Sequence, residues 1–174
     1  MDNKYPIGEF DFTVKRKVSD VSEWIEEIRE LPLKVKAELY GVSDEVLNTP
    51  YRKNGWTVLE VVHHLCDSHM NALIRVKLAL TEDNPTIKPY DETAWATLGD
   101  YDEVSIKSAL RMLTVIHEKW FSVLNNMKKK HFKRTFHHPE SGIDYTLALA
   151  TAMYAWHGNH HLAHIQLVTQ KKEA

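Results

Sequence analysis

Four of the eleven histidines in this 174-residue chain lie in one short segment, Trp156-His-Gly-Asn-His-His-Leu-Ala-His164. His160 and His164 are spaced i, i+4, so on an α-helix their side chains lie one turn apart on the same face. Two neutral imidazoles held in this way can chelate one metal ion. A further histidine pair, His63 and His64, lies in another predicted helix. Three histidines from two helices would leave one position of a tetrahedral zinc site open for water or substrate.

The four histidines of the last segment share one helical face. At about 100° per residue, they and Ala150, Met153 and Val168 fall within an arc of about 100°. This face should be buried, and buried imidazoles need partners. Those partners are either backbone carbonyls and other histidines or a metal ion, and a cluster of this size favours the metal. The H-E-x-x-H motif of metalloproteases is absent from the sequence.

The earlier histidine pair can be interpreted in two ways. His64 shares a helical stripe with the polar residues Asp67, Asn71 and Arg75, whereas the stripe of His63 is mainly apolar. The polar stripe can line a site, with Asp67 orienting a ligand histidine. It can equally be the solvated face of the helix, with His63 pointing inward. Periodicity leaves both interpretations open.

Four long amphipathic helices are predicted around these residues. They begin near Val21, at Val58 after a Thr57/Glu60 capping box, near Asp102, and at Asp144 or Thr146, the last running to about Gln170. Pro32 is expected to break or kink the first helix. A loop from Asn84 to about Tyr101 carries aromatic residues and should pack on the protein, and residues 134–145 should form a short hairpin or structured loop. The pattern predicts an all-α four-helix bundle, as one domain over residues 1–174.

Composition excludes several classes of protein. The formal net charge is −2, which gives no general basic surface for nucleic acid. A single cysteine, Cys66, excludes an intrachain disulfide framework and fits a reducing compartment. The longest apolar stretch, residues 147–156, is far shorter than the ~20 residues that span a bilayer, and no signal peptide is evident. We expect a cytoplasmic protein that binds neither nucleic acid nor membrane.

Several blocks of the sequence resemble the YfiT-type branch of the DinB superfamily. They cover nearly the whole chain: Tyr5-Pro-Ile-Gly-Glu-Phe10, Thr49-Pro-Tyr-Arg52, Gly55-Trp-Thr-Val58, His63-His-Leu-Cys-Asp-Ser-His-Met-Asn71, Arg134-Thr-Phe-His-His-Pro-Glu-Ser-Gly142 and Tyr154-Ala-Trp-His-Gly-Asn-His-His-Leu-Ala-His164. The resemblance implies a four-helix bundle that holds a divalent metal with three histidines, one from the second helix and two from H-x-x-x-H on the last.

Carried over to this chain, the resemblance assigns His160 and His164 as the pair on the last helix. The first ligand in the family precedes an apolar residue, which matches His64-Leu65 and leaves His63 as the alternative. Members of this branch are described as homodimeric, cytoplasmic metal-dependent hydrolases that act on small molecules. Related bundles are S-transferases or isomerases that use low-molecular-weight thiols such as bacillithiol or mycothiol.

We therefore expect an enzyme with one divalent metal per chain, zinc first and nickel or another transition metal next. Its expected reaction is transfer of a bacillithiol-type thiol to a small electrophile, with hydrolysis by metal-activated water as the alternative. The absence of an H-E-x-x-H glutamate slightly favours the thiol reaction, although Glu60, Asp67 and Asp144 remain candidate bases.

Two residues of the His64 stripe are candidates for binding the thiol cofactor. Asn71 and Arg75 could hold its polar or anionic groups, since the guanidinium fork of arginine suits carboxylates. They could equally lie on a solvated face or in an ion pair between helices. A non-catalytic metal-binding dimer, with His157 or His63 as a fourth protein ligand, is the remaining alternative.

Overall fold

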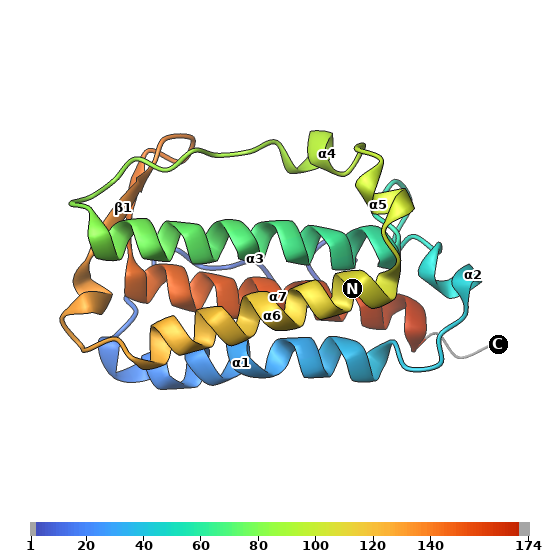
Figure 1. Ribbon diagram of the computed structural model, residues 1–174, viewed down its shortest axis with the longest axis horizontal. Helices are drawn as coiled ribbons and strands as arrows, with labels where there is room; N and C mark the ends of the chain where they lie inside the picture. Colours follow the sequence, from blue (N-terminus) through green and yellow to red (C-terminus); the bar gives the residue numbers. More distant parts are fainter. Residues whose placement is uncertain (1–2, 171–174) are drawn as a thin grey trace.

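The computed structural model of the protein describes residues 3–170. Its long helices are α1 (Val21–Glu38), α3 (Val58–Thr81), α6 (Ile106–Asn125) and α7 (Leu147–Thr169). They form a four-helix bundle in which α6 and α7 each pack against both α1 and α3 (Figure 1). The predicted all-α bundle is confirmed, and α3 and α7 are neighbours in it.

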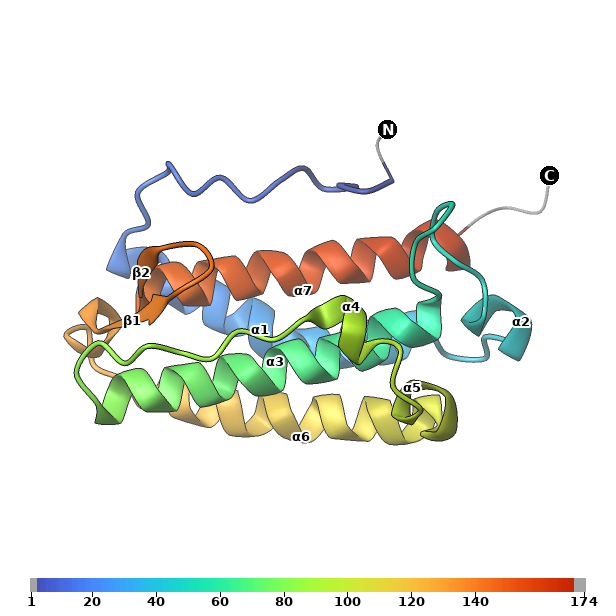
Figure 2. The same cartoon turned by 90° about the horizontal axis from the view of Figure 1, so that it is seen from above.

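The segment between α3 and α6 is long because these two helices run in the same direction (Figure 1). The chain from Glu82 to Ser105 must therefore return along the length of the bundle. It does so above the line between α3 and α7, and forms the short helices α4 (Glu92–Trp95) and α5 (Asp100–Glu103) on the way (Figure 2). The expected packed loop is thus the segment from Glu82 to Ser105, which we call the roof because it covers one edge of the bundle. A separate helix, α5, precedes α6.

A small hairpin precedes α7, as the sequence predicted. Strands β1 (Thr135–His138) and β2 (Ile143–Thr146) are antiparallel, with Phe136 opposite Tyr145. The hairpin also holds the start of the roof, because the His137 backbone N–H donates to the Pro85 carbonyl at 2.9 Å. The remaining elements are α2 (Asp44–Leu47) and the 3₁₀ turns η1 (Val18–Asp20) and η2 (His131–Lys133). The segment before η1 runs beside α7 (Figure 2).

Local sequence signals set where the long helices begin. The Glu60 backbone N–H donates to Thr57 Oγ1 at 3.2 Å, and the Thr57 backbone N–H donates to Glu60 Oε2 at 2.6 Å, which is the predicted capping box. Thr146 caps α7 by accepting from the Leu149 backbone N–H at 3.1 Å. These two caps fix the residues at which α3 and α7 begin.

The expected break at Pro32 does not occur, since α1 is continuous from Val21 to Glu38. Pro32 has no backbone N–H, so the Ile28 carbonyl four residues earlier lacks its helical partner. A side chain from α6 replaces that partner: His117 Nδ1 lies 2.5 Å from the Ile28 oxygen. The bundle therefore compensates for the hydrogen bond that proline removes.

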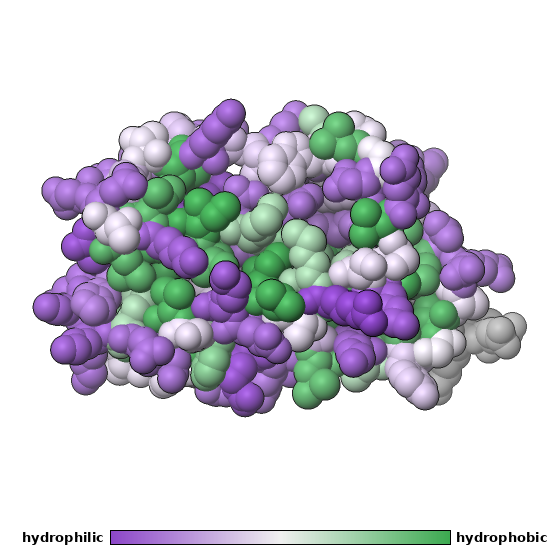
Figure 3. All heavy atoms as spheres, in the orientation of Figure 1, coloured by the Kyte–Doolittle hydropathy of each residue, from purple (hydrophilic) through white to green (hydrophobic). Residues whose placement is uncertain are grey.

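Histidines divide the core into two apolar clusters. One surrounds Trp120 and Phe136 near the hairpin, and the other surrounds Leu65 and Leu113 towards the opposite end. The surface is more mixed: on the face of Figure 3 polar and apolar side chains are interspersed. Met112 of α6 is one of the exposed apolar residues. Among residues 3–170, no helix is both long and apolar enough to cross a membrane.

Candidate metal centre

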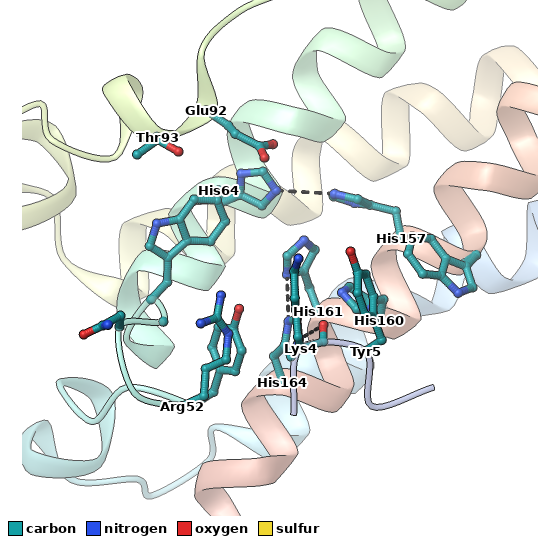
Figure 4. Close-up of a pocket in the computed structure, with 15 residues that line it drawn as sticks. Lys4, Tyr5, Arg52, His64, Glu92, Thr93, His157, His160, His161 and His164 are labelled. Carbon is teal, nitrogen blue, oxygen red and sulfur yellow. Dashed lines mark hydrogen bonds between the residues drawn. The ribbon is translucent and has the colours of Figure 1, made fainter. Parts of the chain in front are cut away.

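Three histidines from α3 and α7 form the cluster best arranged for a metal ion. His64, His157 and His161 each offer one ring nitrogen, and these nitrogens lie within 4.8 Å of one another (Figure 4). His157 and His161 are one helical turn apart on α7. His64 Nε2 lies 3.3 Å from His157 Nε2. Nitrogens bound at ~2.05 Å in a tetrahedral zinc site are about 3.3 Å apart, so this spacing fits a cation between the two rings.

Burial keeps these three imidazoles neutral. Desolvation, with a smaller contribution from His164, lowers the pKa of His64 to about 4. Desolvation and the neighbouring imidazoles hold the pKa values of His157 and His161 well below the usual value. Neutral imidazole is the form that binds metals, because one ring nitrogen then keeps a free lone pair.

A row of histidines extends from His157 across the bundle. His157 Nδ1 lies 3.1 Å from His69 Nε2 on α3, and His69 Nδ1 lies 2.7 Å from His117 Nε2 on α6. The row ends at the Ile28 carbonyl on α1, which faces His117 Nδ1. All four long helices therefore contribute to one chain of hydrogen bonds, which lies between the two apolar clusters.

The Ile28 carbonyl determines the direction of every bond in this row. A carbonyl oxygen only accepts, so His117 Nδ1 carries the proton and donates to it. Burial lowers the pKa of His117 to about 4, so Nε2 of this neutral ring accepts from His69 Nδ1. By the same argument His69 Nε2 accepts from His157 Nδ1, since burial also holds the pKa of His69 low. His157 Nε2 is then left with a lone pair that faces His64.

A second carbonyl acts on His161 in the same way. His164 Nε2 lies 3.2 Å from the backbone oxygen of Lys4, and His164 Nδ1 lies 3.4 Å from His161 Nδ1. His164 therefore donates to the carbonyl and accepts from His161, since burial lowers the pKa of His164 and favours its neutral form. This places the proton of His161 on Nδ1 and the lone pair on Nε2. Two of the three clustered histidines are thus held in the tautomer that a metal requires.

The structure groups the predicted ligands differently from the sequence interpretation. The predicted trio was His64, His160 and His164, whereas His64 lies with His157 and His161. His164 instead lies behind His161 as its hydrogen-bond partner. His160 stacks on Trp156 with ring centroids 4.6 Å apart, and its Nδ1 is buried without a partner in the described part of the chain.

The alternative first ligand, His63, lies on another side of α3. Its Nε2 is 3.1 Å from the Val104 backbone oxygen, and its ring stacks on Tyr101. The segment on α7 contains two overlapping i, i+4 pairs, 157/161 and 160/164. Both pairs lie in the same predicted arc, so their spacing did not distinguish them.

Two adjoining cavities lie beneath the roof. The first, of about 420 Å³, contains the three clustered histidines and is also lined by the N-terminal segment and the loop before α3 (Figure 4). The second, of about 520 Å³, extends towards the hairpin. His157, Glu92 and Thr93 line both cavities. The histidine cluster therefore faces one end of an elongated binding space.

The two predicted cofactor-binding residues have different positions. Arg75 lines the second cavity and donates from Nη1 to Tyr154 Oη at 2.9 Å. Asn71 lines neither cavity, and its side-chain amide donates to the Asp67 backbone oxygen of its own helix at 2.9 Å. Arg75 can therefore contact a bound molecule, while Asn71 is engaged within α3.

Glu92 is the carboxylate that the sequence interpretation missed. It is the first residue of α4 in the roof, and its side chain is directed towards His64 (Figure 4). Partial desolvation, with the nearby charges of Asp91 and Glu140, raises the pKa of Glu92. Nothing in the local sequence marks it, because its place above the cluster depends on the return path of the roof.

The three candidate bases named from the sequence are engaged elsewhere. Glu60 closes the capping box of α3. Asp67 accepts from the Tyr101 hydroxyl at 2.9 Å, and Asp144 lies 2.7 Å from His137 Nδ1 in the hairpin. Neither cavity is lined by any of the three. Glu92 is therefore the carboxylate best placed to accept a proton at the cluster.

Cys66 is not a candidate nucleophile. It is buried, and its thiol donates to the Ala109 backbone oxygen at 3.2 Å. Burial raises the pKa of this thiol to about 12, so it stays protonated at neutral pH. It is a small core residue.

Comparison with known proteins places the chain among related bundles. The sequence profile of the DinB superfamily matches residues 29–165. A protein of Oceanobacillus iheyensis, named "Putative metal-dependent hydrolase", is 47% identical over 173 residues, which is 99% of each chain. One of Halalkalibacterium halodurans with the same description is 44% identical over 166 residues, covering 95% of this chain and 96% of the relative.

A solved structure matches the fold over almost its full length. YfiT from Bacillus subtilis, described as "a probable metal-dependent hydrolase with an unusual four-helix bundle topology", has a TM-score of 0.93 and 41% sequence identity. The match covers 98% of both chains. The likeness therefore includes the roof and the hairpin as well as the four long helices.

Proposed function

The chain belongs to the DinB superfamily, and from that membership and the histidine geometry we propose a metal-dependent hydrolase that binds one divalent cation through His64, His157 and His161. The observation that carries the proposal is the 3.3 Å separation of the Nε2 atoms of His64 and His157. His157 and His161 support it, because each has its remaining ring nitrogen bonded to another histidine. We expect zinc first, with nickel as the next candidate, since imidazole suits both ions.

A divalent cation on three imidazoles is a Lewis acid with an open position, and it makes water or a thiol nucleophilic at neutral pH. The chain supplies the other requirements. Glu92 accepts the proton that the nucleophile loses, for which its raised pKa is suited. The row behind His157 keeps that ring neutral and in one orientation. The roof adds Glu92 and Thr93 to the lining of the cavity.

Thiol transfer is the second candidate, and the second cavity is the observation that favours it. Its volume of about 520 Å³ beside the cluster can hold a second molecule, such as a bacillithiol-type thiol, next to an electrophile. The sequence slightly favoured this reaction because it lacks an H-E-x-x-H glutamate. Glu92 removes that reason, so we place hydrolysis first.

The ligand set is tested by metal content. Purified wild-type protein should hold about one divalent ion per chain, whereas His64→Ala, His157→Ala and His161→Ala should lose it. His160→Ala should retain the ion and serves as the matched control on the same helix. Loss of metal in His160→Ala with retention in His157→Ala would instead support the trio predicted from the sequence.

The reaction is tested with the metal-loaded, chelated and His157→Ala proteins on a panel of esters and amides, beside conjugation of a fluorogenic electrophile with several thiols. Hydrolysis by the metal-loaded protein alone is the expected result. Conjugation without hydrolysis would make the protein an S-transferase, and neither activity would make it a non-catalytic metal-binding bundle. The homodimer, the cytoplasmic location and the small-molecule substrate stay predictions.

A further inference from the structure

Arg75 is a buried cation that forms no ion pair with any of the described residues. Its exposed fraction is 9%, and no ion pair within residues 3–170 includes it. Its one hydrogen bond to a described residue runs from Nη1 to Tyr154 Oη, and Nε is buried without a partner. The Nε and Nη2 edge of the guanidinium, which is the edge that binds a carboxylate side-on, is therefore uncommitted. A buried guanidinium in this state is costly unless a ligand supplies the charge.

The surroundings of Arg75 form a binding cavity. The guanidinium lines the space of about 520 Å³ together with Ser68, His138 and Met153. His138 Nδ1 is a second buried nitrogen without a partner in the described residues. Pro89 and Tyr90 of the roof add apolar and aromatic surface to the same cavity. Two uncommitted polar groups beside apolar walls are typical of a site that orients a small organic ligand.

This cavity adjoins the one that holds the histidine cluster. His157 and Glu92 line both spaces, so a molecule bound in one lies next to the other. Arg75 is six residues beyond His69 and eleven beyond His64 on the same helix. At ~1.5 Å per residue, the Cα of Arg75 therefore lies roughly 16–17 Å along α3 from that of His64.

We propose that Arg75 is a carboxylate-binding subsite, and that the substrate is an elongated molecule with its reactive group at the histidines and one carboxylate at Arg75. Placing the reactive group there rests on the proposed function, whereas carboxylate binding does not. A single negative charge is favoured because Asp91, Glu92 and Glu140 also line the cavity. These acidic groups would repel a phosphate dianion or a polyanion more strongly than a carboxylate.

Binding can be measured without turnover. The full-length protein, as purified, is titrated with 4-phenylbutyrate, with its neutral amide, and with phenylbutyl phosphate, by ligand-observed NMR. The Arg75 Nε–H resonance reports on the site in the wild type. We expect the carboxylate to bind at least about tenfold more tightly than the amide, and more tightly than the phosphate, because a hydrogen bond to a charged group contributes that much.

Variants assign that preference to one side chain. Arg75→Met should bind the carboxylate and the amide equally, Arg75→Lys should keep part of the difference, and Arg111→Met, which removes an exposed arginine on α6, should behave like the wild type. Equal affinities in the wild type, or an undiminished preference in Arg75→Met, would overturn the proposal. Tighter binding of the phosphate would overturn the carboxylate assignment. If Arg75→Met does not fold, the wild-type comparison and the Arg75 Nε–H shift still decide. Failure of hydrolysis would leave this binding result intact.

Discussion

His69 links the candidate metal ligand His157 to the far side of the bundle, so its replacement tests the hydrogen-bonded row directly. His69→Phe keeps a ring of similar shape at a position with an exposed fraction of 0%. It removes the bonds to His117 Nε2 and His157 Nδ1, which measure 2.7 and 3.1 Å. Each nitrogen left buried without a partner costs about 1–3 kcal/mol, so the free energy of unfolding should fall by about 2–6 kcal/mol, less a gain from the more apolar ring.

The same variant should weaken metal binding, although His69 lies too far back to touch the ion. The tautomer of His157 is then no longer fixed, and loss of such a partner typically lowers metal affinity ~10–100-fold, or about 1.4–2.7 kcal/mol. Urea unfolding of the chelated protein measures the first effect, and zinc competition against a chromogenic chelator measures the second. His63→Phe is the matched control, since it replaces a buried histidine of α3 that faces Val104, and it should lose stability without losing zinc affinity. A folded His69→Phe protein that binds zinc as tightly as the wild type would refute the reasoning.

Three further changes have defined outcomes. Gly158→Ala should lower the midpoint of urea unfolding, because the new methyl would lie 2.5 Å from Leu31 Cδ2, and overpacking of about 1–3 kcal/mol exceeds the ~1 kcal/mol gain in helix propensity. The chelated protein should lose stability as pH falls from about 6.5 to 4, measured by denaturant titration at each pH. Burial lowers the pKa of His64 and His117 to about 4, so over this range the unfolded chain binds protons that the folded chain does not. Glu92→Gln should lower kcat by ~10²–10⁴-fold with metal content unchanged, and an unchanged pH–rate profile would exclude it as the base.

Much of the fold was predictable because its signals are local. The Thr57/Glu60 box gave the start of α3, and the apolar periodicity of α7 gave a helix ending near Gln170. The hairpin before α7 was signalled by the turn residues Ser141 and Gly142. The pattern did not give the relative direction of the helices. That α3 and α6 run in the same direction follows from how the four helices bury their apolar faces against one another. The roof, and therefore Glu92, depends on that direction.

In the candidate metal centre, too, the sequence indicated the types of residue, whereas their arrangement depends on how the helices pack. A histidine cluster on the last helix and a partner on an earlier one were evident, and His64 is in the cluster. The 157/161 and 160/164 pairs are centred about 60° apart around the helix, and an arc of about 100° that contains both does not distinguish them. His69 and His117 were not identified at all. His117 is the one histidine of α6, and His69 lies five residues beyond the His63/His64 pair on α3. Only the packing of α3 against α6 brings the two together.

Pro32 links the sequence of α1 to the hydrogen bonds of the candidate metal centre. As a sequence feature it predicts a helix break, because residue 32 cannot donate to the Ile28 carbonyl. In the bundle that carbonyl is buried and must accept a hydrogen bond from some group, and His117 Nδ1–H donates it. A hydrogen bond with only one possible direction at that end fixes the direction of every bond that follows, as far as His157. α1, which contributes none of the three clustered histidines, therefore determines which nitrogen of His157 is free to bind a metal.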